Sequence, residues 1–170
     1  YTGGRLHIPV VSSAESVKLI KEAKKKGLAI TASTTPHHLM FTDEEIACFD
    51  GTFKVEPPLR AKADRKALRT ALADGILDGI CSDHRPENPE NNDVEFLLSP
   101  NGMAGISSTF SAVLSACDKA NITRVIDAIS NANRRVYNMP EVHIAEGAEA
   151  KLTLFNPKGK HTCPGVSAGV

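Results

Sequence analysis

The strongest constraint on the fold of this chain is the alternation of strand-like and helix-like stretches in its first half. Apolar, β-rich runs occupy residues 6–11, 28–34, 52–56 and 77–82, and each has the length of a buried strand. Helix-like stretches separate them, at residues 15–26, after residue 42 and at residues 64–73. A parallel connection needs a dozen or more residues and usually a helix. The order therefore predicts parallel βαβ units in a barrel or a doubly wound sheet.

The predicted helices begin and end at suitable residues. Ser13 is a suitable N-cap for the first helix, and Gly27 is a suitable C-terminal stop. The segment TDEE at residues 42–45 has the form of a capping box. Beyond a long polar loop at residues 85–101, the sequence predicts helices at 106–118 and 122–137 and a strand at 150–157.

Composition excludes several classes of function. The 170 residues include 20 basic and 20 acidic side chains. The chain therefore lacks the excess of basic residues that gives nucleic-acid-binding domains a pI usually above about 9. No apolar run approaches the roughly 18 residues of a membrane-spanning helix, and the first nine residues lack the apolar core of a signal peptide. We therefore expect a cytoplasmic protein with no nucleic-acid or membrane partner.

Polar side chains follow each predicted strand. The carboxyl ends of the strands form the functional face of parallel α/β folds, so these residues predict a site. His37 and Asp83 are the best candidate pair, because a neutral imidazole and a carboxylate can share one zinc or manganese ion. A histidine after proline can equally cap a helix or face water. Likewise Arg60, aimed by Pro57 and Pro58, either meets an anion or is solvated.

Five segments together carry a family resemblance. They are RLHIPVVSSAES (5–16), TASTTPHHLMFTDEE (31–45), FKVEPPLRAKADRKAL (53–68), DGILDGICSDHRPE (74–87) and AEGAEAKLTLFNP (145–157). In this order they resemble the dihydroorotase branch of the amidohydrolase superfamily. Allantoinases and dihydropyrimidinases share the plan, but TPHHL and PPLR look most like dihydroorotase.

The resemblance implies a parallel (β/α) barrel of the TIM type with a small β-sandwich. Residues 1–140 look like strands five to eight of that barrel, and residues 141–170 look like the start of the sandwich segment. A complete barrel takes about 250 residues. A half-barrel leaves strand edges open, so we expect a homo-oligomer or another assembly that covers them.

The resemblance also implies an activity and a set of site residues. Members of the family interconvert carbamoyl-aspartate and dihydroorotate in pyrimidine biosynthesis, at a centre of zinc or manganese. By position, His37 is a metal ligand and Asp83 is a metal ligand and the catalytic proton shuttle. Glu56, Arg60 and Glu87 fall at substrate-binding positions.

Three positions that are functional in the family carry different residues in this chain. Val10 stands where the family has a metal-binding histidine, Glu56 where it has asparagine and Glu87 where it has histidine. Valine has no lone pair, and a like charge within about 4 Å of an anionic substrate costs roughly 4 kcal/mol at an effective dielectric near 20. Two hypotheses follow: a weakly active or inactive metal-dependent cyclic amidase, or a pseudoenzyme that scaffolds aspartate transcarbamoylase.

Overall fold

A computed structural model describes residues 3–117, 121–157 and 159. Its three strands, β1 (Leu6–Ile8), β2 (Ile30–Thr34) and β3 (Gly79–Ile80), form a sheet in that order. Both pairings are parallel, with Leu6 opposite Ile30 and Ser33 opposite Gly79. The prediction of parallel βαβ units is confirmed for this part of the chain.

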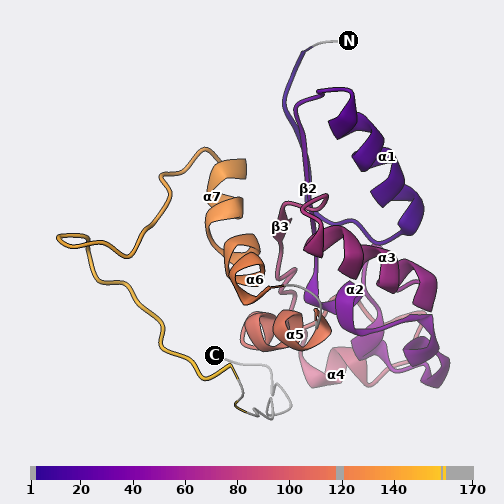
Figure 1. The fold of residues 1–170 in the computed structure, drawn as a ribbon. Helices are drawn as coiled ribbons and strands as arrows, with labels where there is room; N and C mark the ends of the chain where they lie inside the picture. Colours follow the sequence, from indigo (N-terminus) through magenta and orange to yellow (C-terminus); the bar gives the residue numbers. More distant parts are fainter. Residues whose placement is uncertain (1–2, 118–120, 158, 160–170) are drawn as a thin grey trace.

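Two helices of the βαβ units pack on each other beside the sheet (Figure 1). Helix α1 (Ala14–Lys25) begins at Ser13, whose hydroxyl accepts a hydrogen bond from the Ser16 amide at 3.2 Å. The backbone φ of Gly27 is +73° beyond its end, which is the left-handed conformation that glycine adopts at helix ends. Helix α3 (Lys62–Ala73) buries Leu68 and Leu72.

Short helices fill the connection between β2 and α3. Helix α2 (Pro36–Met40) follows β2 directly, with Thr35 as its N-cap. The 3₁₀ helix η1 (Asp43–Cys48) begins with the predicted capping box between Thr42 and Glu45, and the 3₁₀ helix η2 (Gly51–Phe53) follows it.

The strand predicted at residues 52–56 is wrong. Its first residues form η2, and β3 pairs directly with β2 instead. Lys54 contacts the loop that follows β3: its carbonyl oxygen accepts a hydrogen bond from the Gly102 amide at 2.8 Å. A β-rich run becomes a strand only where a neighbouring strand can pair with it, so the expectation of barrel strands five to eight is reduced to three strands within the described ranges.

The second half of the chain is helical and less regular than predicted. It contains α4 (Pro89–Asn92), α5 (Thr109–Ala116), α6 (Ile122–Ile129) and α7 (Asn131–Val136). The single helix predicted at residues 122–137 is wrong, because Ser130 takes φ −112° and ψ −92° and separates α6 from α7. Residues 150–157 form no strand, since none of the described segments pairs with them.

One apolar core joins the sheet to helices on both sides of it. Its buried members come from β2, β3, α1, α2, α3, α5, α6 and the segments between them, and include Ala32, Ile80, Ile20, Leu39, Leu72, Val113 and Val125. Among the described helices, none is both long and apolar enough to cross a membrane.

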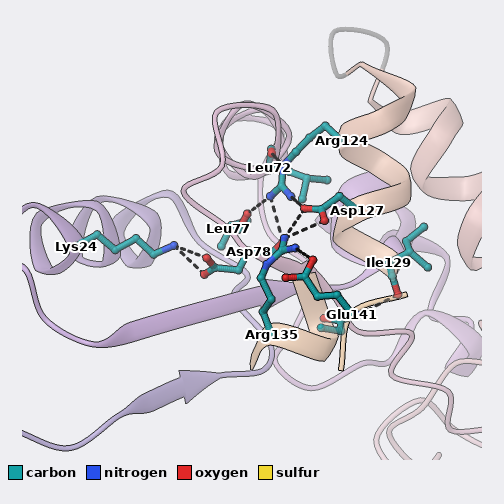
Figure 2. Close-up of polar contacts among 10 residues, drawn as sticks. Lys24, Leu72, Leu77, Asp78, Arg124, Asp127, Ile129, Arg135 and Glu141 are labelled. Carbon is teal, nitrogen blue, oxygen red and sulfur yellow. Dashed lines mark hydrogen bonds and ion pairs between the residues drawn. The ribbon is translucent and has the colours of Figure 1, made fainter. Parts of the chain in front are cut away.

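A polar cluster closes the end of the sheet where the strands begin (Figure 2). Asp78 accepts hydrogen bonds from Lys24 of α1 at 2.7 Å and from the Ala32 amide of β2 at 2.8 Å. Arg124 of α6 donates to the carbonyl oxygens of Leu72 and Asp78, at 3.0 and 3.1 Å. This cluster satisfies backbone groups that sheet pairing leaves free, so its role is structural.

Candidate functional site

The candidate site lies at the opposite end of the sheet, where β2 and β3 end. His37 and His38 occupy the first turn of α2, not an extended loop, and both are only 2% exposed. Successive residues of a helix point about 100° apart, so the two rings enter different surroundings.

His37 faces the end of β3. Burial lowers the pKa of His37, while the backbone carbonyl of Asp83 and the carboxylate of the same residue act in the opposite direction. A Cβ atom added at Gly105 would lie 2.8 Å from Cε1 of His37, so glycine is required for this close packing. The Nε2 atom of His37 is buried and has no hydrogen-bond partner among the described residues. In the tautomer that carries its proton on Nδ1, the Nε2 atom has a lone pair that a metal ion could bind.

His38 has a structural environment. Its Nδ1 atom lies 2.7 Å from the hydroxyl oxygen of Thr35, and its Nε2 atom lies 2.9 Å from the carbonyl oxygen of Pro57. Burial also lowers the pKa of His38. The ring thus links the start of α2 to the segment that carries Glu56 and Arg60.

Asp83 stands directly beyond β3 in the left-handed region, with φ +44°. Its side chain is 11% exposed, and its Oδ1 atom accepts a hydrogen bond from Nε of Arg85 at 3.0 Å. His84 turns away: its Nδ1 atom accepts from the amides of Gly105 and Ile106, at 3.1 and 3.3 Å. The structure therefore brings His37 and Asp83 together and assigns His84 to anchoring the following loop.

The three candidate substrate-binding residues are more solvated. Glu56 is exposed, and its Oε2 atom accepts a hydrogen bond from Asn101 at 3.1 Å. Glu87 is half-buried and accepts from Asn91 at 3.0 Å. Arg60 is exposed, and its carbonyl oxygen accepts from the Asp43 amide at 3.0 Å. Substrate binding by these three residues stays a prediction.

The fit of this site to zinc or manganese is partial. His37 offers a buried, unpartnered nitrogen, and Asp83 offers a carboxylate whose charge acts on the same ring. Stable zinc sites use three or four protein ligands, and the described residues contain no group of three or more histidine, cysteine, aspartate or glutamate side chains placed to hold an ion. Metal binding by His37 and Asp83 therefore stays a prediction.

Two residues have roles near the site that the sequence did not assign. Arg85 lies among the polar residues that follow the fourth predicted strand, but its pairing with Asp83 was not predicted. Lys54 donates to the carbonyl oxygens of Phe96, Leu97 and Ser99 at 2.9, 3.0 and 2.6 Å. It thereby fastens the loop after β3 to the segment before Glu56. Its position in the FKVE segment, taken as a strand, concealed that role.

Comparison with known proteins identifies dihydroorotases as relatives of this chain. No protein-family model matches the chain. The dihydroorotase of Anaeromyxobacter dehalogenans is 39% identical over 165 residues, which is 95% of this chain and 38% of that protein. The dihydroorotase of Thermus aquaticus is 37% identical over 163 residues, again 38% of its length. The chain therefore spans well under half the length of the curated relatives it matches.

Solved structures with a similar fold include a dihydropyrimidinase and a dihydroorotase. Dihydropyrimidinase from Brevibacillus agri NCHU1002 superposes with a TM-score of 0.75 at 27% identity, covering 87% of this chain and 35% of that one. Dihydroorotase from Saccharomyces cerevisiae, solved with 5-fluoroorotic acid, gives a TM-score of 0.71 at 19% identity and covers 80% of this chain and 39% of that one. The latter similarity concerns the fold alone.

Proposed function

This chain belongs to the dihydroorotase family, and on that premise we propose that it supplies half of the site of a metal-dependent cyclic amide hydrolase. The observation that carries the proposal is His37, whose Nε2 atom is buried without a partner close to Asp83. An unpaired buried nitrogen costs free energy, and a bound cation would remove that cost. The substrate proposed is dihydroorotate, or carbamoyl-aspartate in the reverse direction.

In the proposed reaction the residues of this chain have separate roles. His37 and Asp83 would hold zinc or manganese, which when bound supplies an activated water. Asp83 would accept the proton of that water as its oxygen bonds to the ring carbonyl carbon, and would pass the proton to the leaving amide nitrogen as the ring C–N bond breaks. Arg60 would attract the substrate carboxylate, whereas Glu56 and Glu87 would repel it.

The test is an assay of dihydroorotate ring opening with added zinc or manganese. We expect no measurable turnover from this chain alone, because Val10 replaces one ligand and two ligands do not complete a site. Turnover near the roughly 10 s⁻¹ typical of enzymes would contradict this. In the product of the full open reading frame, we expect any activity to fall at least about 1,000-fold in both His37→Ala and Asp83→Asn; unchanged rates would overturn the assigned roles.

A second candidate is a non-catalytic homologue that scaffolds aspartate transcarbamoylase. It is favoured by the departures at Val10, Glu56 and Glu87, and by the ion pair that occupies Asp83. Co-purification of the full gene product with aspartate transcarbamoylase, without dihydroorotase activity, would support it. Failure to co-purify would remove it.

A further inference from the structure

The Asp83 carboxylate already has a cation beside it. The Nε atom of Arg85 donates to Oδ1 of Asp83 at 3.0 Å, and the two side chains are 53% and 11% exposed. A carboxylate this shielded from water is stabilised by a nearby positive charge. In this chain the guanidinium supplies that charge from only two residues away.

The backbone of Arg85 is held in place, so the pairing does not depend on a loose surface side chain. The Arg85 amide donates to the carbonyl oxygen of Met103 at 3.1 Å, next to a parallel bridge between His84 and Met103. Gly102 packs so closely that a Cβ atom there would lie 2.5 Å from the carbonyl oxygen of Arg85. Only glycine permits this approach, which fixes where the Arg85 side chain starts.

From this geometry we propose that Arg85 is a positioning residue that acts as the internal counter-ion of Asp83 and lowers its affinity for a divalent cation. This inference rests on the proposed function, which places a metal ion at Asp83. An ion that binds Oδ1 either displaces the guanidinium or has its like charge nearby, and an ion that binds the other oxygen also has that charge nearby. Both routes weaken binding, so the direction of the effect does not depend on which oxygen is used.

The experiment is a zinc titration of the full chain by isothermal titration calorimetry. The variants are Arg85→Gln, Arg85→Lys, Asp83→Asn and the double variant Asp83→Asn/Arg85→Gln. Arg5→Gln is the control for net charge, because Arg5 precedes β1 at the other end of the parallel sheet. The double variant tests whether Arg85 acts through Asp83, since coupled residues give non-additive effects.

We expect Arg85→Gln to bind zinc about threefold to tenfold more tightly than the unmodified chain, as removal of a partly exposed ion pair allows. Arg85→Lys should lie between the two, Arg5→Gln should match the unmodified chain, and Arg85→Gln should have no effect once Asp83 is asparagine. Unchanged or weaker binding in Arg85→Gln overturns the proposal. The absence of zinc binding in both the unmodified chain and Arg85→Gln also overturns it, because removal of the Arg85 guanidinium would then have uncovered no metal site.

The same titration separates this inference from the proposed function. If Asp83→Asn weakens zinc binding but Arg85→Gln does not strengthen it, only the counter-ion role fails. If Asp83→Asn binds zinc as well as the unmodified chain, the metal is not at Asp83, and both proposals fail.

Discussion

Neighbouring residues in the TPHHL segment have opposite roles. His37 keeps a buried nitrogen without a partner among the described residues, whereas both ring nitrogens of His38 lie within 3 Å of a polar atom. The difference arises because the His37 ring turns toward the end of β3 and the His38 ring turns toward Pro57. At the residue scale, the role of each histidine therefore depends on whether its ring nitrogens have hydrogen-bond partners.

Replacing the buried His38 should destabilise the fold more than replacing an exposed histidine does. His38→Ala removes contacts to Thr35 and Pro57 and leaves a cavity at a site that is 2% exposed. We expect a loss of about 2–4 kcal/mol in the free energy of unfolding, measured by urea denaturation. The control is His143→Ala at an exposed position, which should stay within about 0.5 kcal/mol. Equal effects of the two substitutions would contradict the structural role.

Stability should fall as the pH is lowered through the histidine range. Burial lowers the pKa of both His37 and His38 in the folded chain, whereas in the unfolded chain both titrate near 6.5. Below about pH 6.5 the unfolded state therefore binds more protons, and the free energy of unfolding decreases. Above that pH this contribution is fully present. Urea denaturation from pH 8 to pH 5 with a chelator should show this decline in the free energy of unfolding. The decline should be shallower in His38→Gln, and a free energy of unfolding that does not change with pH would contradict the prediction.

At the scale of elements, the loop after β3 is fastened by one ammonium group. Lys54 donates to three carbonyl oxygens of that loop. Gly51 also packs against it, since a Cβ atom there would lie 2.9 Å from the side chain of Ser99. The loop that carries Glu87 is thus attached to the segment that carries Glu56.

Substituting Lys54 should free that loop without unfolding the chain. Lys54→Met keeps the aliphatic length but loses three charge-assisted hydrogen bonds, which are worth about 1.5–3 kcal/mol each when well formed. We expect limited proteolysis between residues 94 and 101 to be at least about tenfold faster. Lys62→Met is the matched control, because the ion pair of Lys62 with Glu44 is mostly exposed, at 65% and 64%. Identical cleavage rates in the two variants would refute the anchoring role.

At the scale of the whole molecule, apolar side chains remain outside the core. Leu97 and Leu98 are 78% and 75% exposed, and Leu154 is fully exposed. Single exposed apolar residues are ordinary, but here they accompany a sheet in which β1 is an edge strand among the described residues, whereas Asn133 of α7 donates to the Ile80 carbonyl at the β3 edge. An open strand edge favours pairing with another chain or segment.

We therefore expect the isolated chain to associate. Sedimentation velocity should show a mass that rises with protein concentration, and covering the exposed apolar surface would contribute about 25 cal/mol per Å². Lys substitutions at Leu97 and Leu98 together should weaken the association if that surface takes part. A stable monomer at all concentrations tested would disprove this expectation.

The sequence by itself determined the features that depend on near neighbours. The α1 and α3 helices, the Ser13 cap, the capping box at Thr42 and the parallel strands are confirmed. Each rests on periodicity or on a hydrogen bond spanning about three residues. The family was also evident from short contiguous segments, and a dihydroorotase 39% identical over 165 residues confirms it.

The tertiary structure alone decided the features that depend on residues distant in the chain. The run at 52–56 became a turn because β3 pairs with β2, and Lys54 contacts carbonyls more than forty residues away. The free nitrogen of His37 follows from packing against the end of β3 and Gly105. The position of Arg85 beside Asp83 depends on Met103 and Gly102. A sequence lists these groups, but only the folded chain determines which of them meet, because burial and pairing are properties of the surroundings.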